Sequence, residues 1–160
     1  MIHAHSLNNS GKTIADGFTS EGGKISFNIQ TISKEVGLAH TSAQGKTKGG
    51  KIQIAMGKNG DILSSGTHNV CGKEGGDISI ISNNVSLPAA KLLANGSITG
   101  GTVHISQNDP LASSKKKKGR LKTNSYTKIE VDGAKLKGRI DLWVPPIEEK
   151  ITPQTKLAPT

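Results

Sequence analysis

Short stretches of alternating apolar and polar residues recur along the first two thirds of the chain, each directly after a pair of glycines. The pairs are Gly22-Gly23, Gly49-Gly50, Gly75-Gly76 and Gly100-Gly101, so successive pairs are 27, 26 and 25 residues apart. After each pair come one polar residue and two apolar residues that are separated by another polar one. Alternation with period two, carried by β-branched residues, predicts a strand with one buried side.

The apolar residues after each Gly-Gly pair occupy two equivalent slots, which we expect to stack into ladders inside a narrow coil. A coil of about 25 residues has room for roughly three short strands, and stacking such coils about 4.8 Å apart places like residues over like. We expect the glycines to supply backbone angles that other residues resist, which lets the chain turn sharply. The first slot holds Ile25, Ile52, Ile78 and Val103, and the second holds Phe27, Ile54, Ile80 and Ile105.

The predicted fold class is therefore all-β, a right-handed parallel β-helix that forms a single-stranded solenoid of about four to five coils of 25–27 residues. The predicted parts are 1–107 β-helix coils, 108–125 a basic loop insertion, 126–146 a final coil or cap, and 147–160 a linker or disordered tail. Pro145-Pro146 should end strand pairing, because neither residue has an N–H to donate. We interpret Tyr126 and Trp143, which frame the final coil, as packing in a cap.

Composition narrows the choice of fold, and the single cysteine and the lack of long apolar runs exclude other features. Only 32% of the residues are hydrophobic and 2% aromatic, which is typical either of disorder or of a repetitive β architecture, and the regular isoleucines favour the second. Cys71 is the single cysteine, so an internal disulfide is excluded, and we interpret it as a small filler or a free thiol. The chain shows no signal-peptide pattern and no apolar run of about 20 residues that would span a membrane.

The net charge of +9 comes mostly from one segment. Seven of the 21 basic residues lie between Leu111 and Lys128 without an acidic residue, which leaves 14 basic against 12 acidic residues elsewhere. This segment is either a solvated loop or a contact for polyanions such as acidic glycans, anionic lipid heads or nucleic acid. Aromatic residues are scarce there, so we expect any binding to be non-specific and salt-sensitive. The candidate ligand-binding residues are Lys115, Lys116, Lys117, Lys118, Arg120 and Lys122.

Other chemistry-bearing residues do not form a recognisable site in the sequence. A polysaccharide-degrading β-helix would need carboxylates gathered on one outer face, but Asp61 and Asp77 occur at different offsets from their Gly-Gly pairs, so we expect them on different sides of a coil. Glu74 and Asp77 flank one corner, which we interpret as a solvated turn. His40 and His68 fall at similar offsets and could be stacked neighbours, yet no third metal ligand is evident. We interpret the histidines as ordinary surface residues. The residues weighed are Asp61, Glu74, Asp77, His40, His68 and His104.

The repeat resembles the coils of filamentous-haemagglutinin-like exoproteins, which are large bacterial proteins of the two-partner secretion type. The motifs that carry the likeness are Gly-Gly-Asp-Ile-Ser-Ile, Ser-Asn-Asn-Val-Ser-Leu, Leu-Leu-Ala-Asn-Gly and Gly-Gly-Thr-Val, all between residues 75 and 105. The match covers roughly residues 13–107 and implies a right-handed β-helix with a role in adhesion, aggregation or presentation of a distal domain. The family's amino-terminal secretion domain is not recognisable, and the lysine run is not part of its coil pattern.

These observations lead to one expected function and two alternatives. We expect a non-enzymatic structural or adhesive segment of a secreted bacterial surface protein, without catalytic residues, cofactor or metal. Its partners would be a surface glycan or protein of host or bacterium and the neighbouring coils of a longer parent chain. The first alternative is a polyanion-binding module that uses the lysine segment, and the weaker one is a polysaccharide-degrading enzyme.

Overall fold

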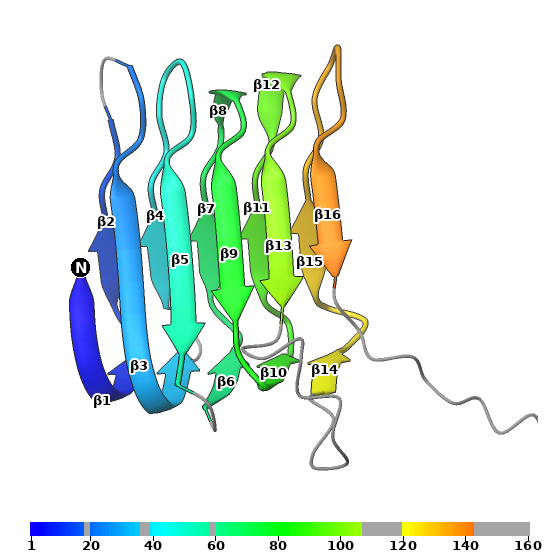
Figure 1. The fold of residues 1–160 in the computed structure, drawn as a ribbon. Helices are drawn as coiled ribbons and strands as arrows, with labels where there is room; N and C mark the ends of the chain where they lie inside the picture. Colours follow the sequence, from blue (N-terminus) through cyan, green and yellow to red (C-terminus); the bar gives the residue numbers. More distant parts are fainter. Residues whose placement is uncertain (18–19, 36–38, 58–59, 107–119, 143–160) are drawn as a thin grey trace, which may run out of the picture.

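The computed structural model describes residues 1–17, 20–35, 39–57, 60–106 and 120–142. In these ranges all the regular secondary structure consists of β-strands, and all strand pairs are parallel. The strands wind into the stacked coils of Figure 1, so the predicted all-β parallel solenoid is confirmed. Three complete coils lie between the four Gly-Gly pairs, with partial coils on either side, which is fewer complete coils than predicted.

The first face of the solenoid contains the strands that follow the Gly-Gly pairs. It begins with β1 (Ile2–Asn9), which pairs with β3. The strands then stack in the order β3 (Lys24–Glu35), β5 (Lys51–Met56), β9 (Asp77–Ile81), β13 (Thr102–Ser106) and β16 (Arg139–Leu142). The first half of β3 belongs to this face, and its second half bends onto the next one.

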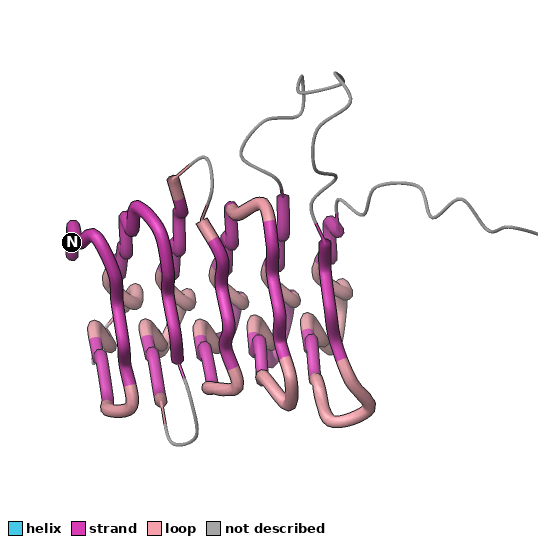
Figure 2. The backbone as a smooth tube through the Cα atoms, turned by 90° about the horizontal axis from the view of Figure 1, so that it is seen from below, coloured by secondary structure: helices cyan, strands magenta, loops and turns pink. Residues whose placement is uncertain are grey.

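Two further faces complete each coil, and Figure 2 shows how strands and loops recur along the axis. The second face consists of the second half of β3 with β6 (Asp61–Ser64), β10 (Asn84–Leu87) and β14 (Arg120–Thr123). The third face consists of β2 (Lys12–Ile14), β4 (His40–Ser42), β7 (Thr67–Asn69), β11 (Lys91–Leu93) and β15 (Lys128–Glu130). In each coil a loop that folds back on itself links the third face to the first face of the next coil, and we call these loops hairpins. Two of them contain the strands β8 (Gly72–Glu74) and β12 (Gly96–Thr99), which pair with each other in parallel.

The core is built from side chains that stack in register along the axis. On the first face, Ile52 pairs with Ile25 and Ile78, and the series continues through Val103. The parallel series from Phe27 to Ile105 is formed in the same way, and all eight ladder side chains are buried. Each contributes roughly 1.5–3 kcal/mol by leaving water. The ladders therefore supply a large part of the apolar stabilisation of the coils.

The two first-face ladders end on the strand β16. Ile140 pairs with Val103 and Leu142 with Ile105, so both side chains occupy ladder slots. They are nevertheless 42% and 44% exposed, because no described strand lies over β16. The sequence pattern in this region, with one glycine in place of two, thus belongs to a strand at the end of the described stack.

The Gly-Gly pairs are needed for close approach of the backbone, and not for unusual backbone angles. None of the described glycines has a φ in the left-handed region, so our expectation about their angles was wrong. A Cβ on Gly49 would collide with the carbonyl oxygen of Val70 in the following hairpin. A Cβ on Gly50 would collide with the carbonyl oxygen of Gly23 in the preceding hairpin. Each pair is therefore enclosed by backbone from both sides.

Lys137 occupies the position of the first glycine in the last described hairpin. The register shows this, since Gly100 donates to the carbonyl of Leu136 as Gly75 donates to that of Thr99. Gly138 keeps the second position, where a Cβ would meet the preceding hairpin. No described hairpin follows, so a side chain is accommodated at Lys137.

One predicted boundary and one predicted packing role differ from the structure. Residues 120–123 fell within the predicted loop insertion 108–125, but they form β14 and pair with β10, because Leu121 continues the inward series of Val85. Tyr126 is 74% exposed, so the interpretation of this residue as cap packing was wrong. Trp143, the tail 147–160 and most of the insertion lie outside the described residues.

Candidate functional site

The predicted cationic residues that the structure describes lie on the outer surface of β14. In this strand Leu121 points into the coil and packs against the core, so Arg120 and Lys122 point outward and are exposed. The strand pairs with β10 on the second face. Lys115, Lys116, Lys117 and Lys118 lie outside the described residues.

Two further lysines on the third face lie around the corner from these cations. Lys91 of β11 and Lys128 of β15 are direct register partners, and both are exposed. Parallel partners are about 4.8 Å apart, so the two positive charges stack on neighbouring coils. We call the residues Lys91, Arg120, Lys122 and Lys128 the basic corner.

Sequence reasoning missed the pairing of Lys91 with Lys128, although a signal was present. Each lysine directly precedes a residue of the inner ladder, Leu92 in one coil and Ile129 in the next. Aligning Lys-Leu-Leu with Lys-Ile-Glu would have placed both cations in one slot. The intervening insertion, which makes the coil longer, obscured this alignment.

The cations of the basic corner do not form ion pairs with the described acidic residues. The nearby acids are engaged by amides, since Asp61 accepts a hydrogen bond from Asn84 Nδ2 (2.6 Å) and Glu130 from Asn95 Nδ2 (2.9 Å). Like charges that lie opposite each other in a sheet are destabilising, so the stacking of Lys128 on Lys91 costs stability.

A tight turn joins the two faces at this corner. Asn124 accepts a hydrogen bond from the N–H of Tyr126 (3.1 Å) and donates its own N–H to Thr127 Oγ1 (3.0 Å). Such an Asx-type arrangement holds the turn through its own side chains. Tyr126 is at the tip, with its ring in solvent.

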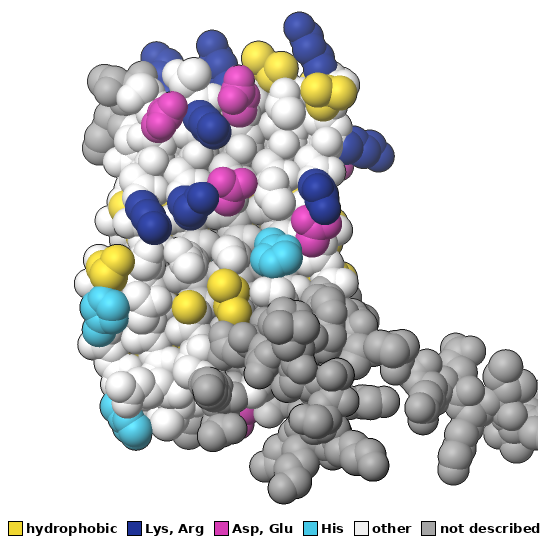
Figure 3. Space-filling view, in the orientation of Figure 1, with side chains coloured by type: hydrophobic (Ala, Val, Ile, Leu, Met, Phe, Trp, Pro, Cys, Tyr) yellow, Lys and Arg dark blue, Asp and Glu magenta, His cyan; other side chains and the backbone are white. Residues whose placement is uncertain are grey.

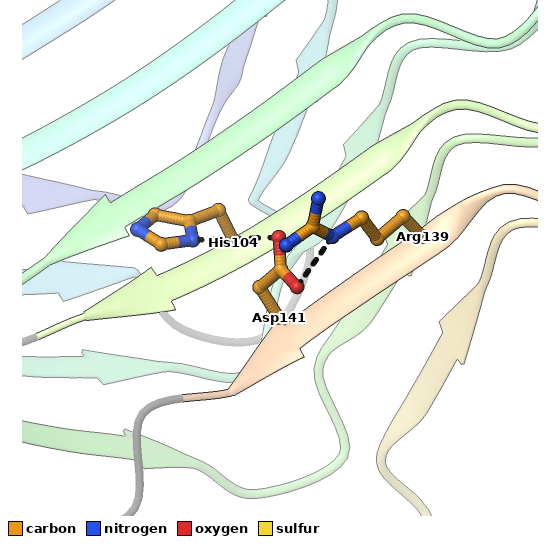
Figure 4. A network of polar contacts seen from close by, with 3 residues as sticks. All are labelled: His104, Arg139 and Asp141. Atoms are coloured by element: carbon orange, nitrogen blue, oxygen red, sulfur yellow. Dashed lines mark hydrogen bonds and ion pairs between the residues drawn. The ribbon is translucent and has the colours of Figure 1, made fainter.

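The first face carries charges of both signs (Figure 3). Lys51 forms an ion pair with Asp77 on the neighbouring strand (3.5 Å). Figure 4 shows a second group, in which Asp141 of β16 binds Arg139 Nε (2.7 Å) and lies 3.9 Å from His104 Nδ1 of β13. These contacts cross between neighbouring coils or lie along one strand, and they bring acid and base together.

The histidines do not form a shared site. His40 pairs with Thr67 and His68 with Thr41, so the two rings are one residue out of register and lie on opposite sides of the third face. His68 points into the coil, is 1% exposed and lies 3.1 Å from Ser64 Oγ, so its assignment as a surface histidine was wrong. His104 is on the outer surface, as expected.

The carboxylates considered for catalysis lie on three different strands, of which two belong to different faces and one to a hairpin. Asp61 is on β6 of the second face, Asp77 on β9 of the first face and Glu74 on β8 in a hairpin. In the part of the chain that the structure describes, no group of three His, Cys, Asp or Glu side chains is close enough to hold a metal ion. The same ranges contain no helix long and apolar enough to cross a membrane.

Cys71 is half-buried at the start of a hairpin. Its Sγ points to the carbonyl oxygen of Leu93 (3.7 Å). Burial raises the pKa of the thiol above its ordinary value, and the negative charge of Glu130 adds to this shift. A raised pKa lowers the thiolate fraction and with it the reactivity of the sulfur.

Comparisons with protein-family models, with curated proteins and with solved structures found no match to this chain.

Proposed function

We propose that this chain is a structural, adhesive segment of a secreted bacterial surface protein of the haemagglutinin-like type, which mediates adhesion or presents other domains. The observation that carries the proposal is the stacking of coils in register, which runs on the first face from Ile25 to Ile140. Coils that contact only their neighbours form extended scaffolds with long continuous surfaces. The likeness of residues 75–105 to haemagglutinin-like coils supports the same function.

Surface labelling and adhesion together test this function. Antibodies raised against the folded chain should label intact cells of the bacterium that produces it. Beads coated with the protein should adhere to host or bacterial cells more strongly than beads coated with the Ile54→Asp variant, which we expect to be unfolded. Labelling that requires permeabilised cells, or equal adhesion of the two kinds of bead, would contradict the proposal.

The second candidate function is binding of polyanions, and the basic corner is the observation that favours it. Four exposed cations on two neighbouring coils are left without ion pairs among the described residues. Electrostatic binding of this kind should be strong at low salt and weaken as salt screens the charges.

Retention on a heparin column at low salt tests the second function. Removing residues 111–124 would also remove β14, so substitution is the cleaner change. Replacing Arg120, Lys122 and Lys128 with alanine should lower the salt concentration needed for elution markedly, while Lys115, Lys116, Lys117 and Lys118 remain in place. Replacing Lys46 and Lys73, which are exposed at the hairpins, should lower it only slightly. Absence of retention, or equal effects of the two sets, would contradict the function.

A further inference from the structure

The turn at the basic corner is held rigidly to the coil beneath it. The Thr127 hydroxyl donates to the carbonyl of Leu87 (2.5 Å), and the N–H of Ala89 donates to Asn124 Oδ1 (2.9 Å). Ala89 makes this contact with a φ of 59°, the one left-handed non-glycine residue in the described ranges. Such a conformation is unfavourable for alanine and persists only where the surroundings impose it. The tip that carries Tyr126 is therefore preorganised.

The side chain at this tip is exposed although it is partly apolar. Tyr126 is 74% exposed, and the hydrogen bonds of the turn involve its backbone and leave the ring outside. Tyrosine combines an apolar ring with a polar hydroxyl, a combination that favours the boundary between lipid chains and water. An exposed aromatic at a rigid tip thus suits contact with an interface.

The cations are placed on both flanks of the tip. Arg120 and Lys122 precede the turn on the second face, and Lys128 follows it on the third face beside Lys91. If the tip enters a layer of anionic groups, the flexible lysine and arginine side chains on either flank extend toward charges around it. Tyr126 therefore lies between cations on the second face and cations on the third face.

The shape of the corner favours a surface over a polymer held in a groove. A hollow of about 480 Å³ lies near β1, at the opposite end of the solenoid from the corner, and is lined by His5, Gln30 and Met56 among others. The described part of the corner is the exposed turn between β14 on the second face and β15 on the third face. Cations on two outward-facing sheets with one aromatic between them lack the successive stacking platforms that single-stranded nucleic acids use.

We propose that the basic corner binds the surface of an anionic lipid bilayer, with Tyr126 at the level of the headgroups and Lys91, Arg120, Lys122 and Lys128 contacting the phosphates. This inference rests on the second candidate function, polyanion binding, and names its ligand. It concerns peripheral attachment through electrostatics and one aromatic side chain, the two terms that govern binding of proteins to anionic leaflets.

Sedimentation with vesicles tests the inference on the full chain. The protein should bind vesicles of phosphatidylcholine mixed with phosphatidylserine, and not vesicles of phosphatidylcholine alone. Each cation removed from the corner should lower the affinity roughly fivefold. Tyr126→Ser should weaken binding to vesicles several-fold and leave heparin retention unchanged, whereas Tyr126→Trp should preserve vesicle binding.

Matched controls make the test decisive. The pair Lys46→Ala and Lys73→Ala removes the same charge as two corner substitutions, at the hairpins, and should have little effect on vesicle binding. Circular dichroism should show that every variant remains folded. Heparin retention without vesicle binding would overturn the lipid assignment and leave polyanion binding intact. If the unchanged chain binds neither heparin nor vesicles, the lipid assignment and polyanion binding are both overturned. An equal loss of heparin and vesicle binding in Tyr126→Ser would overturn the role of the tip.

Discussion

The first face and the basic corner are built by the same stacking rule, and both stack two lysines in register. The first face offsets its pair, Lys24 beside Lys51, with Asp77 on the next strand, whereas the described strands place no acid in register with Lys91 and Lys128. On the first face the stack places Asp77 beside Lys51, and the two form an ion pair. At the corner the stack places Lys128 beside Lys91, and neither has an ionic partner among the described residues. Parallel coils bring like slots together, so charges repel unless the sequence alternates their sign. The comparison separates a stack of opposite charges, which stabilises the coils, from a stack of like charges, which does not.

The largest expected effect breaks both regions at once, because they share one interior. Ile54→Asp places a carboxylate in a fully buried ladder slot without a partner, and this should cost about 4 kcal/mol or more. That is a large part of the stability of a small domain. The variant should show no cooperative unfolding transition by circular dichroism, and Ile80→Asp should behave alike. Gln53→Asp and Ser79→Asp, on the outward side of the same strands, should unfold within about 1 kcal/mol of the unchanged chain. Equal effects at both kinds of position would contradict the register.

The next effect concerns the hairpins that connect the third face to the first. Gly49→Ala directs a methyl group against the carbonyl of Val70 in the following hairpin, and we expect a loss of about 3 kcal/mol. Gly11→Ala is the matched control, since the nearest atom to its Cβ would be Asn9 Oδ1 at 4.0 Å. Urea unfolding should show a change below about 0.5 kcal/mol for this control. A destabilisation of the same size in both variants would contradict collision with Val70 as the cause.

The ladders were predictable from the sequence, and the reason for the glycines was not. Ile52 and Ile54 follow their Gly-Gly pair at fixed offsets, and period-two alternation is a local property that a single sequence reveals. The need for glycine at Gly49 depends on Val70, which is brought near only by the following hairpin. A contact between residues of different coils has no local signature, so the turn geometry was the plausible but incorrect explanation.

The candidate site was predictable only in part, for the same physical reason. Arg120 and Lys122 stood out because they lie in a run of cations, whereas Lys91 joins them only through register with Lys128. The inward direction of His68 likewise depends on which residue of a short strand faces the coil, and the strand there is too short for the alternation to decide. Pairing across an insertion of variable length is what the linear pattern lacks.

A smaller effect is expected when the sign of one charge is reversed in each of the two stacks. Lys128→Glu converts a like-charge stack into an attractive pair with Lys91 and should stabilise the chain by about 0.5 kcal/mol. Asp77→Lys replaces the ion pair on the first face with repulsion against Lys51 and should destabilise it by a similar amount. Both differences should shrink in about 1 M salt, where charges separated by more than about 3 Å are screened. Thermal unfolding at low and high salt measures this, and changes of the same sign in the two variants would contradict the contrast.

The smallest expected effect is chemical and uses Cys71 as a reporter of the hairpins between the two regions. Because burial raises the pKa of this thiol, its thiolate fraction at a given pH is lower than that of a free cysteine. Alkylation with iodoacetamide near pH 8 should therefore be several-fold slower than in the unfolded Ile54→Asp variant, whose thiol has a pKa of about 8.5. The difference should narrow as the pH rises above both pKa values. Substitutions at the basic corner should leave the rate unchanged, whereas Gly49→Ala should raise it, because that hairpin packs beside the one in which Cys71 lies. A rate in the folded protein equal to that of the unfolded variant would mean that the hairpins open readily, and would weaken the view that backbone close approach is what holds the coils together.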